Sequence, residues 1–489
     1  MFIIILSLIT CYNYLKRKVG QHLNISKKQK SVLIILVIGT FLGFLNQTLM
    51  NVALPNIMHE FNIGPGLGQW ITNGYMLVNG VMVPLTAFLI QRLTTRRLYL
   101  TAVGLFAIGT LIAGFAPNFT VLITGRMIQA MGAGVFGPLM NVIVMNLFAP
   151  DKRGGAMGLI GLALNFAPTL GPTLSGFIVT NLSWRFLFFI VAPLIIADFI
   201  LAYFLLQNIG EQKMLKFDFI GVVLSSIGLG SLLYGFSNAG ATPWSEFTVW
   251  GFIVIGLIVT ALFIWRQFST KTPLLNMAVL KQREFVIAML INIVLMIAMY
   301  GGALMLPLYM QTIRGASAFI SGLVLFPGAL VTAFLSPWSG RLYDQYGVKY
   351  LTLIGILITA AGTIVLASLT LTTPLWFAVI GQFIRQLGLV LVLMPIQTEA
   401  FNALPLALMP DGSAMFTTVR QIAASFGTAA LVTIMTRSSL SYGKTHASTL
   451  DVLIQLHGIK ITFLTAAALM LVGAALTLLF RNKAPRDFI

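Results

Sequence analysis

The sequence predicts an all-α membrane protein with fourteen transmembrane helices, built as two six-helix halves and an inserted helix pair. Of its 489 residues, 58% are hydrophobic and only 9% are charged, whereas a soluble domain carries roughly 25% charged residues. The apolar residues fall in runs of about 20, the helix length that crosses about 30 Å of hydrocarbon. Motifs in the first half of the chain also return in the second half. Together these observations exclude a soluble enzyme.

Each apolar run is expected to be a helix, because hydrocarbon offers the backbone N–H and C=O groups no hydrogen-bond partners. The expected spans are 32–53, 66–90, 98–117, 119–147, 155–179, 185–206, 219–238, 248–267, 284–306, 317–339, 350–371, 374–398, 413–437 and 460–480. The longest connections, 268–283 and 438–459, leave no room for a soluble catalytic domain. We therefore expect no enzymatic activity.

A repeat divides the chain into segments. Residues 87–98 return as 340–351, and the arginine-containing segment 125–132 of the fourth span returns as 382–388 in the twelfth. Six-helix repeats are what transporters use to build a site at the repeat interface. The expected segments are a basic cytoplasmic N-terminus at 1–31, an N-terminal half at 32–206, an inserted pair with its linkers at 207–283, a C-terminal half at 284–480 and a cytoplasmic tail at 481–489.

Positive charge is concentrated on one side of the predicted membrane. The chain has 30 Lys and Arg residues against 12 Asp and Glu, which in a soluble protein would favour nucleic acid as a partner. Here 22 of the 30 basic residues fall in the two termini, in the even-numbered connections or, for Arg266, at the end of the span before one. Because cytoplasmic loops are enriched in basic residues, we expect a cell-membrane protein with both termini in the cytoplasm. We therefore expect these basic residues to interact with lipid headgroups and not with nucleic acid.

Cysteine and histidine give no sign of a metal or redox site. The single cysteine, Cys11, excludes an intramolecular disulfide, and the four histidines all fall outside the spans. Residues 2–10 are too short to cross a membrane and lack the basic start of a signal peptide, so we interpret them as an interfacial or extended segment. No metal and no cofactor is expected.

Four segments carry a family resemblance. Residues 45–55 lie in the first span, 340–349 follow a pattern with Gly340 and Asp344, 125–132 contain Arg126, and 168–176 contain Gly171, Pro172 and Gly176. Taken together they resemble the major facilitator superfamily, specifically its fourteen-helix drug:proton antiporter branch of EmrB-like and QacA-like exporters. The resemblance covers nearly the whole chain and implies the major facilitator fold.

The resemblance implies a set of gating residues. Gly171, Pro172 and Gly176 permit a bend and close helix approach in the fifth span, with ordinary packing as the alternative. Asp344 can bond the N-terminus of the following helix or Arg341, and so latch the two halves. In the first copy of this loop motif Gln91 stands where the family has its Asp. The latch at that loop, which we call a corner of the bundle, must therefore be weaker or different. The predicted gating set is Asp344, Arg341, Gly340, Arg92, Gly171, Pro172 and Gly176.

Three charged residues within spans are the predicted proton-coupling groups. A charge inside the membrane costs at least about 2.5 kcal/mol on insertion scales unless it is paired or hydrated. By its match to the family motif, Arg126 would face the central cavity and take part in proton release. Asp198 lies near the centre of the sixth span and Glu399 closes the twelfth. A structural hydrogen bond for Asp198, and an ordinary solvated acid at Glu399, stay open as alternatives.

Asn46 is the sharpest departure from the family. The branch commonly has an Asp at this position, and an amide cannot carry a coupling proton. Asn46, Gln47, Gln129 and Asn165 are instead predicted to bind substrate through hydrogen bonds. The 22 Met and 36 Phe residues would suit a lining for flat apolar drugs, although lipid-facing surface needs the same residues.

The sequence thus predicts a proton-driven multidrug efflux antiporter that exports amphipathic or cationic drugs by alternating access. Its expected partners are small-molecule drugs, protons and membrane lipids, and we expect a monomer. Three alternatives remain: a dedicated exporter of one metabolite or antibiotic, coupling to Na⁺ or K⁺, which Asn46 and the scarcity of embedded acids motivate, and a membrane sensor. The lack of a soluble signalling domain speaks against the last.

Overall fold

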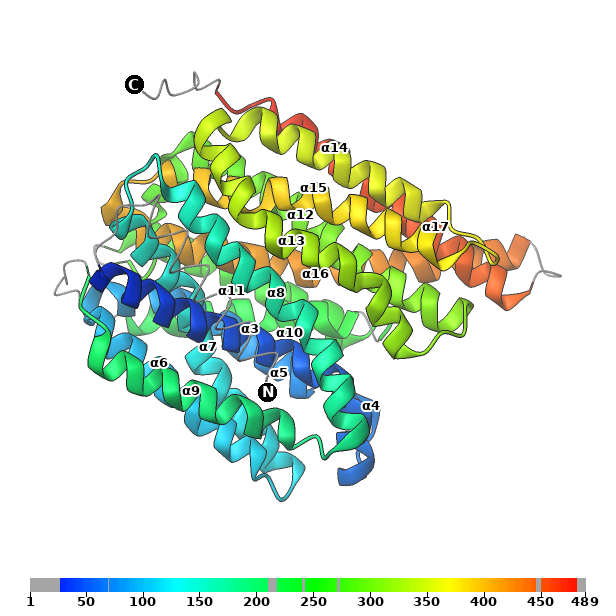
Figure 1. Cartoon of the computed structure of the whole chain (residues 1–489), viewed down its shortest axis with the longest axis horizontal. Coiled ribbons are helices and arrows are strands. Elements are labelled where there is room, and N and C mark those ends of the chain that lie inside the picture. The colour runs from blue at the N-terminus through cyan, green and yellow to red at the C-terminus, as the bar shows by residue number, and fades with distance from the viewer. Residues whose placement is uncertain are drawn as a thin grey trace.

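The chain folds into a bundle of long helices (Figure 1), seen in a computed structural model that describes residues 27–68, 70–209, 218–239, 242–270, 273–445 and 450–481. The helices are α3 Lys27–Phe61, α4 Pro65–Gly68, α5 Trp70–Arg92, α6 Thr95–Gly114, α7 Phe119–Leu147, α8 Arg153–Asn181, α9 Phe186–Leu205, α10 Phe219–Ala239, α11 Phe247–Ser269, α12 Arg283–Leu308, α13 Ala318–Tyr346, α14 Val348–Ala367, α15 Leu375–Asn402, α16 Met409–Thr445 and α17 Asp451–Thr477. Short 3-10 turns at Met277–Lys281 and Leu406–Leu408 and a π turn at Tyr309–Ile313 complete the description.

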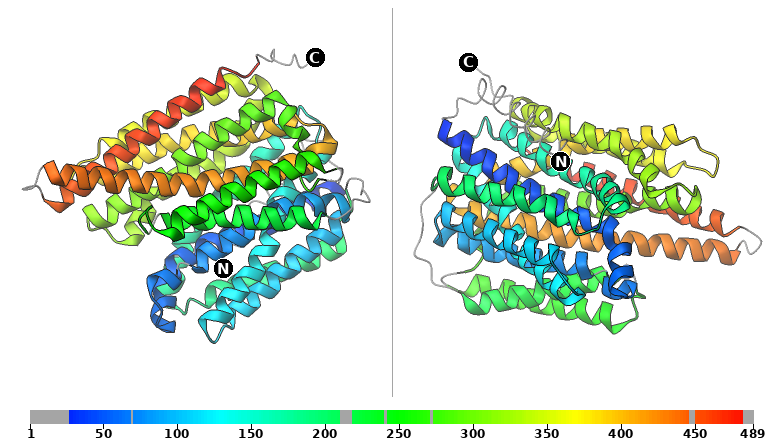
Figure 2. Two further views of the ribbon diagram at one scale, coloured as in Figure 1. Left: turned by 180° about the vertical axis from the view of Figure 1, so that it is seen from behind. Right: turned by 60° about the horizontal axis from the view of Figure 1, so that its bottom comes forward.

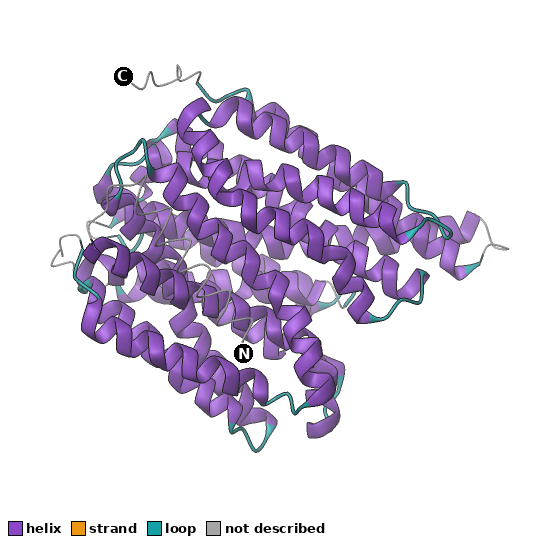
Figure 3. Ribbon diagram, viewed as in Figure 1, coloured by secondary structure: helices purple, strands orange, loops and turns teal. Residues whose placement is uncertain are grey.

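The fourteen expected spans all fall on long helices. Among the described residues, thirteen helices are long and apolar enough to cross a membrane, and α8, with 29 residues, is the fourteenth long helix. In the described part of the chain Figure 3 shows helices and loops without strands. The predicted all-α fold class is therefore confirmed. The chain is a multi-pass membrane protein, since nothing else accounts for so many apolar helices.

The expected loop at 438–459 was wrong in extent. Helix α16 continues to Thr445 and α17 already begins at Asp451. The two helix ends pack against each other, because the rings of Tyr442 and His457 stack with their centroids 4.2 Å apart. This tertiary contact outweighs the polar composition from which a loop was expected.

Both described ends of the bundle lie on the same side. With fourteen membrane crossings, α3 begins at Lys27 and α17 ends at Thr477 on one face, which lies to the left in Figure 1. We refer to it as the terminal face, and to the other end of the bundle as the opposite face. From this face the N-terminal helices and the C-terminal helices diverge towards the opposite face (Figure 1).

Small residues set the packing inside each half in the same way. Helices α6 and α7 approach so closely that a Cβ on Gly132 would lie 2.2 Å from the carbonyl oxygen of Ala102. Helices α14 and α15 do the same, with a Cβ on Gly388 only 2.4 Å from the carbonyl oxygen of Gly355. Because lipid gives helices no hydrophobic reason to associate, such backbone contacts carry the packing. The repeat seen in the sequence is thus a repeat of helix pairs.

The inserted pair α10 and α11 packs between the halves rather than apart from them. Helix α10 contacts both α5 and α16, and Figure 2 (left) shows the green pair between the orange α16 and the blue α5. Arg266 at the end of α11 pairs with Asp218 at 2.8 Å. Burial alone would raise the pKa of Asp218, but hydrogen bonds from Arg266 and from the Gly221 N–H outweigh it and hold the pKa below its usual value.

We expect Gly132→Val to destabilise the protein, because its side chain has no room against the α6 backbone. Overpacking of this kind costs about 1–3 kcal/mol. Thermal unfolding of the purified chain in detergent should show a lower Tm. Gly176→Ala is the control, because a Cβ at Gly176 meets nothing within 4 Å. Equal Tm values for the two variants would contradict the packing argument.

Candidate functional site

An acidic side chain at the terminal face joins the two halves. Asp344, in the last turn of α13, accepts hydrogen bonds from the backbone N–H groups of Gly154 at 2.9 Å and Gly155 at 2.8 Å. These groups belong to the first turn of α8, where a helix has unpaired donors and partial positive charge. The partners expected from sequence were the following helix or Arg341. Arg341 is exposed, and the contact instead reaches a helix of the other half.

Two glycines allow α8 and α13 to meet beside this carboxylate. A Cβ on Gly340 would lie 2.0 Å from the carbonyl oxygen of Gly154, and a Cβ on Gly154 would lie 2.5 Å from the carbonyl oxygen of Gly340. Both distances are far below van der Waals contact. The predicted gating residue Gly340 therefore lies where the two halves touch backbone to backbone.

A chain of hydrogen bonds beside the Asp344 contact starts from Glu399. Its side chain is only 2% exposed, although it lies within one turn of the end of α15. Glu399 Oε2 accepts from Tyr343 Oη at 2.7 Å, and Tyr343 Oη accepts from Asn402 Nδ2 at 2.9 Å. Asn402 Oδ1 then accepts from Arg153 Nη1 at 2.9 Å. This Glu399 chain runs from a carboxylate in the C-terminal half to a guanidinium in the N-terminal half.

The hydrogen bonds of the Glu399 chain run in a defined direction. The Asn402 amide nitrogen can only donate, so Tyr343 accepts there and has its single hydroxyl hydrogen left for Glu399. Arg153 also donates to the carbonyl oxygens of Phe148 at 3.1 Å and Met145 at 2.7 Å. It therefore caps the end of α7 while it holds the C-terminal half.

Amide and hydroxyl groups continue this contact into the bundle. Asn141 of α7 donates to Ser413 Oγ at 3.1 Å and accepts from Gln397 Nε2 at 3.0 Å. One level deeper, Gln421 of α16 donates to the carbonyl oxygen of Met76 in α5 at 2.9 Å. Together with the Asp344 contact and the Glu399 chain, these bonds close the space between the halves at the terminal face.

Asp198 lies apart from this interface, inside the N-terminal half. Its Oδ2 lies 2.6 Å from Tyr99 Oη, which is also 2.8 Å from the carbonyl oxygen of Ile35. A phenol has one hydrogen, and the carbonyl can only accept. Both contacts are hydrogen bonds only when Asp198 carries a proton and donates it to Tyr99. The geometry therefore suits a neutral Asp198 that ties α9 to α6 and α3.

Arg126 is buried within the N-terminal half, at 1% exposure. Its Nη1 donates to Asn46 Oδ1 and, at 2.7 Å, to Gln129 Oε1, while Nε donates to the carbonyl oxygen of Ile71 at 3.4 Å. The guanidinium carbon lies 4.2 Å from the centroid of the Tyr75 ring. All of these partners are neutral.

The equivalent arginine of the C-terminal half has a similar environment. Arg385 is 2% exposed, and its Nη2 donates to the carbonyl oxygen of Met299 at 3.0 Å. Its Nε has no hydrogen-bond partner among the described residues. The sequence repeat thus places one buried guanidinium in each half.

The other predicted gating residues lie outside the interface contacts. Arg92 is exposed and lies 5.7 Å from the centroid of the Phe88 ring. At the same corner Gln91 donates to its own helix, at the Ala87 carbonyl oxygen, so this corner differs from the Asp344 corner as expected. A Cβ on Gly171 would lie 2.1 Å from Thr48 Oγ1, which makes Gly171 a packing contact between α8 and α3. The side chain of Pro172 lies outside the described residues.

The predicted substrate-binding residues fall into three situations. Asn46 and Gln129 are fully buried partners of Arg126, and Gln129 also donates to Thr110 Oγ1 at 2.7 Å. Gln47 is half-buried. The side chain of Asn165 lies outside the described residues. The structure thus brings Asn46 and Gln129 together, in the core of one half.

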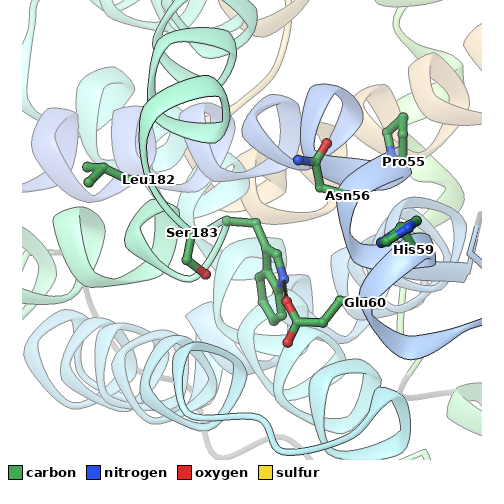
Figure 4. A pocket seen from close by; sticks show the side chains of 7 residues that line it. Pro55, Asn56, His59, Glu60, Leu182 and Ser183 are labelled. Atoms are coloured by element: carbon green, nitrogen blue, oxygen red, sulfur yellow. Dashed lines mark hydrogen bonds between the residues drawn. The ribbon is translucent and has the colours of Figure 1, made fainter.

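A pocket of about 540 Å³ lies at the opposite face, between the end of α3 and the loop before α9. Its lining residues are Pro55, Asn56, His59, Glu60, Leu182, Ser183 and Trp184 (Figure 4). Glu60 accepts from Arg185 Nη1 and from Trp184 Nε1, both at 2.6 Å. Burial would raise the pKa of Glu60, but these two hydrogen bonds outweigh it and lower the pKa.

Sequence reasoning missed three polar residues of the terminal face. Arg153 was counted only as loop charge, although the Gly154–Gly155 pair after it marks a helix start that can approach another backbone. Asn141 gave no signal within its apolar helix. Asp411, which is 4% exposed and accepts from the Asn276 N–H at 3.0 Å, could have been found as an acid in the first turn of a helix. In the described part of the chain, no group of three or more His, Cys, Asp or Glu residues could hold a metal ion.

Two helical halves that meet through polar contacts, with an inserted pair between them, define a membrane transporter rather than an enzyme. Residues 36–428 match the Major Facilitator Superfamily, and the chain belongs to this family. It is 42% identical over 472 residues, 95% of this chain and 98% of the relative, to the uncharacterized MFS-type transporter YcnB of Bacillus subtilis (strain 168). It is 35% identical over 420 residues, 86% of this chain and 88% of the relative, to the lincomycin resistance protein LmrB of the same organism. The human organic anion transporter MFSD10 shares the fold, with a TM-score of 0.66 at 15% identity over 92% of this chain and 100% of that one.

We expect Asp344→Asn to loosen the terminal face, because an amide binds the α8 N-terminus more weakly than a carboxylate. Ser336 is fully buried, and its carbonyl oxygen lies 2.4 Å from a Cβ placed on Gly158 of α8. In a Cys11→Ser, Ser336→Cys background, a water-soluble maleimide should label the new cysteine several-fold faster when Asp344 is replaced. Gln345→Ala, at an exposed neighbouring position, is the control. Equal labelling rates would show that Asp344 does not hold the halves together.

Proposed function

We propose that this chain is a proton-driven multidrug efflux antiporter that exports amphipathic or cationic drugs by alternating access. The Glu399 chain carries the proposal, because it connects a buried acid of one half to an arginine of the other. An antiporter needs a titratable group whose charge decides which face of the bundle is closed. Glu399 has the position and the hydrogen bonds for that role.

The terminal face is assigned to the cytoplasm. This assignment rests on the 22 of 30 basic residues that lie in the termini, in the even-numbered connections or, for Arg266, at the end of the span before one, following the positive-inside rule. The structure then corresponds to a state closed on the cytoplasmic side. The pocket beside Glu60 faces outward on this assignment.

Protonation of Glu399 is proposed to open the cytoplasmic side. The ionised carboxylate accepts the Tyr343 hydrogen and so aligns Asn402 towards Arg153. A protonated Glu399 removes the charge at the end of the chain and competes as a donor, which weakens the link to α8. The proton then leaves to the cytoplasm, drug binds, and the ionised acid closes this face again.

Asp198 is assigned a structural role in this scheme. A neutral acid that donates to Tyr99 fixes α9 against α6 and needs no change of charge during transport. Arg126 and Arg385 lie within separate halves and so act inside each rigid unit rather than across the interface.

The drug class rests on relatives and on side-chain chemistry. The name of the relative LmrB describes lincomycin resistance, which supports an exported antibiotic. Met and Phe side chains adapt to varied apolar ligands. Half-buried Gln47 remains the proposed polar contact to substrate. A dedicated exporter has the same fold, and saturable efflux of a single compound across a panel of drugs would distinguish it.

Coupling to Na⁺ or K⁺ at Asn46 is disfavoured by one observation. The Asn46 oxygen that would bind a cation accepts from the Arg126 guanidinium. A second positive charge there would be repelled by the first.

We expect Glu399→Gln to abolish uphill drug efflux, at least tenfold below wild type, while downhill exchange and drug binding persist. Ethidium and lincomycin transport into inverted vesicles with an imposed pH gradient measures this. Asp198→Asn is the matched comparison: its amide still donates to Tyr99, so uphill transport should stay within about twofold. Full uphill activity in Glu399→Gln would remove the coupling assignment, and a loss in Asp198→Asn alone would transfer it to Asp198.

A further inference from the structure

Two neighbouring hydrogen-bond donors in the core of the N-terminal half lack an acceptor among the described residues. Arg126 Nη2 and Asn46 Nδ2 are both buried nitrogens that find no hydrogen-bond partner in the part of the chain that the structure describes. The two residues are 1% and 0% exposed. A buried donor left unpaired is destabilising, and two such groups on adjoining side chains indicate a missing acceptor.

The positive charge of Arg126 also lacks a counter-charge within the half. The groups that face it are Asn46 from α3, Tyr75 and the Ile71 carbonyl from α5, and Gln129 from α7. Gln129 is itself held by Thr110 of α6. Among the described residues, the ion pairs of the protein involve other arginines. An uncompensated charge at this depth is expensive.

The two unpaired donors belong to side chains that are hydrogen-bonded to each other. Nη2 is bonded to the same carbon as Nη1, and Nδ2 to the same carbon as Oδ1, while Nη1 donates to Oδ1. Tyr75 cannot supply the acceptor, because its ring lies against the guanidinium and its hydroxyl is 3.3 Å from the carbonyl oxygen of Gly43. The remaining N–H groups of Arg126 and Asn46 are therefore available to one shared acceptor.

We propose that the N-terminal half binds a small monovalent anion between Arg126 Nη2 and Asn46 Nδ2. A halide or a small carboxylate such as formate satisfies both donors and neutralises the guanidinium. A neutral water satisfies the donors but leaves the charge. The anion takes the electrostatic place that an acidic side chain at position 46 would fill, and it is bound as a resident ion within one half. The proposal does not depend on drug transport.

Thermal unfolding of the purified full chain, at constant ionic strength, tests this site. Gluconate, which is too bulky for the site, is replaced stepwise by chloride, formate or sulfate. A ligand of the folded state raises Tm with its concentration, so chloride, formate or both should raise Tm in a saturable way, whereas divalent sulfate should not. Chloride alone would identify a halide site, and an equal effect of formate would identify a site for small carboxylates as well.

Asn46→Asp is the decisive variant, because it supplies a fixed carboxylate beside Arg126. It should raise Tm in gluconate and reduce the chloride or formate effect at least fivefold. Gln129→Glu places a carboxylate on the other partner of Nη1 and serves if Asn46→Asp does not fold. Arg437→Gln, at an exposed arginine, should keep the wild-type response. A wild-type Tm indifferent to all anions, or an undiminished response in both acidic variants, would overturn the proposal.

Discussion

The hydrocarbon environment forces every polar group of this protein to find its partner within the bundle. The structure meets this requirement both within each half and between the two halves. Within each half, buried arginines and Asp198 bond neutral groups of neighbouring helices, and the half becomes one unit. Between the halves, Asp344, Asn141 and the Asn402–Arg153 bond at the end of the Glu399 chain join the two units, and these bonds must break for the terminal face to open. The same physical demand thus separates the rigid parts from the moving boundary.

Hydrogen-bond direction distinguishes the two embedded acids better than burial does. Asp198 and Glu399 are about equally buried, at 1% and 2% exposure, and each is bonded to a tyrosine. The difference lies in the second partner of that tyrosine. Tyr99 is beside a carbonyl that takes its hydrogen, whereas Tyr343 is beside an amide that leaves its hydrogen free. Asp198 is therefore suited to be neutral, whereas Glu399 accepts the hydrogen of its tyrosine.

Hydropathy and repeats predicted much of the fold, because the lipid constraint acts on local sequence. The fourteen spans, the helix pairs around Arg126 and Arg385 and the special corner at Asp344 all follow from short segments. The partners did not follow. Asp344 binds Gly154, 190 residues away in sequence, and Asn141 meets Gln397 across 256 residues. Such pairings depend on how the two halves dock, which composition and periodicity do not encode.

The two corners of the repeat differ in a way that bears on the direction of opening. At the α13 corner a carboxylate, two helix N–H groups and a glycine contact hold α8. At the α5 corner Gln91 donates a hydrogen bond to its own helix and, among the described residues, makes no such contact. Helix α16 is bound instead by the linker after the inserted pair, because the Asn276 N–H donates to Asp411 at the start of α16. The linker thus ties the inserted pair to the C-terminal half near the terminal face. Opening that begins at the α13 corner would turn the N-terminal half away from α13 while α16 stays bound to the linker. The two loop motifs differ at the acidic position, because Gln91 stands where Asp344 stands in the second copy. The contact between a carboxylate and a helix N-terminus therefore forms between α8 and α13, and this contact holds the terminal face closed.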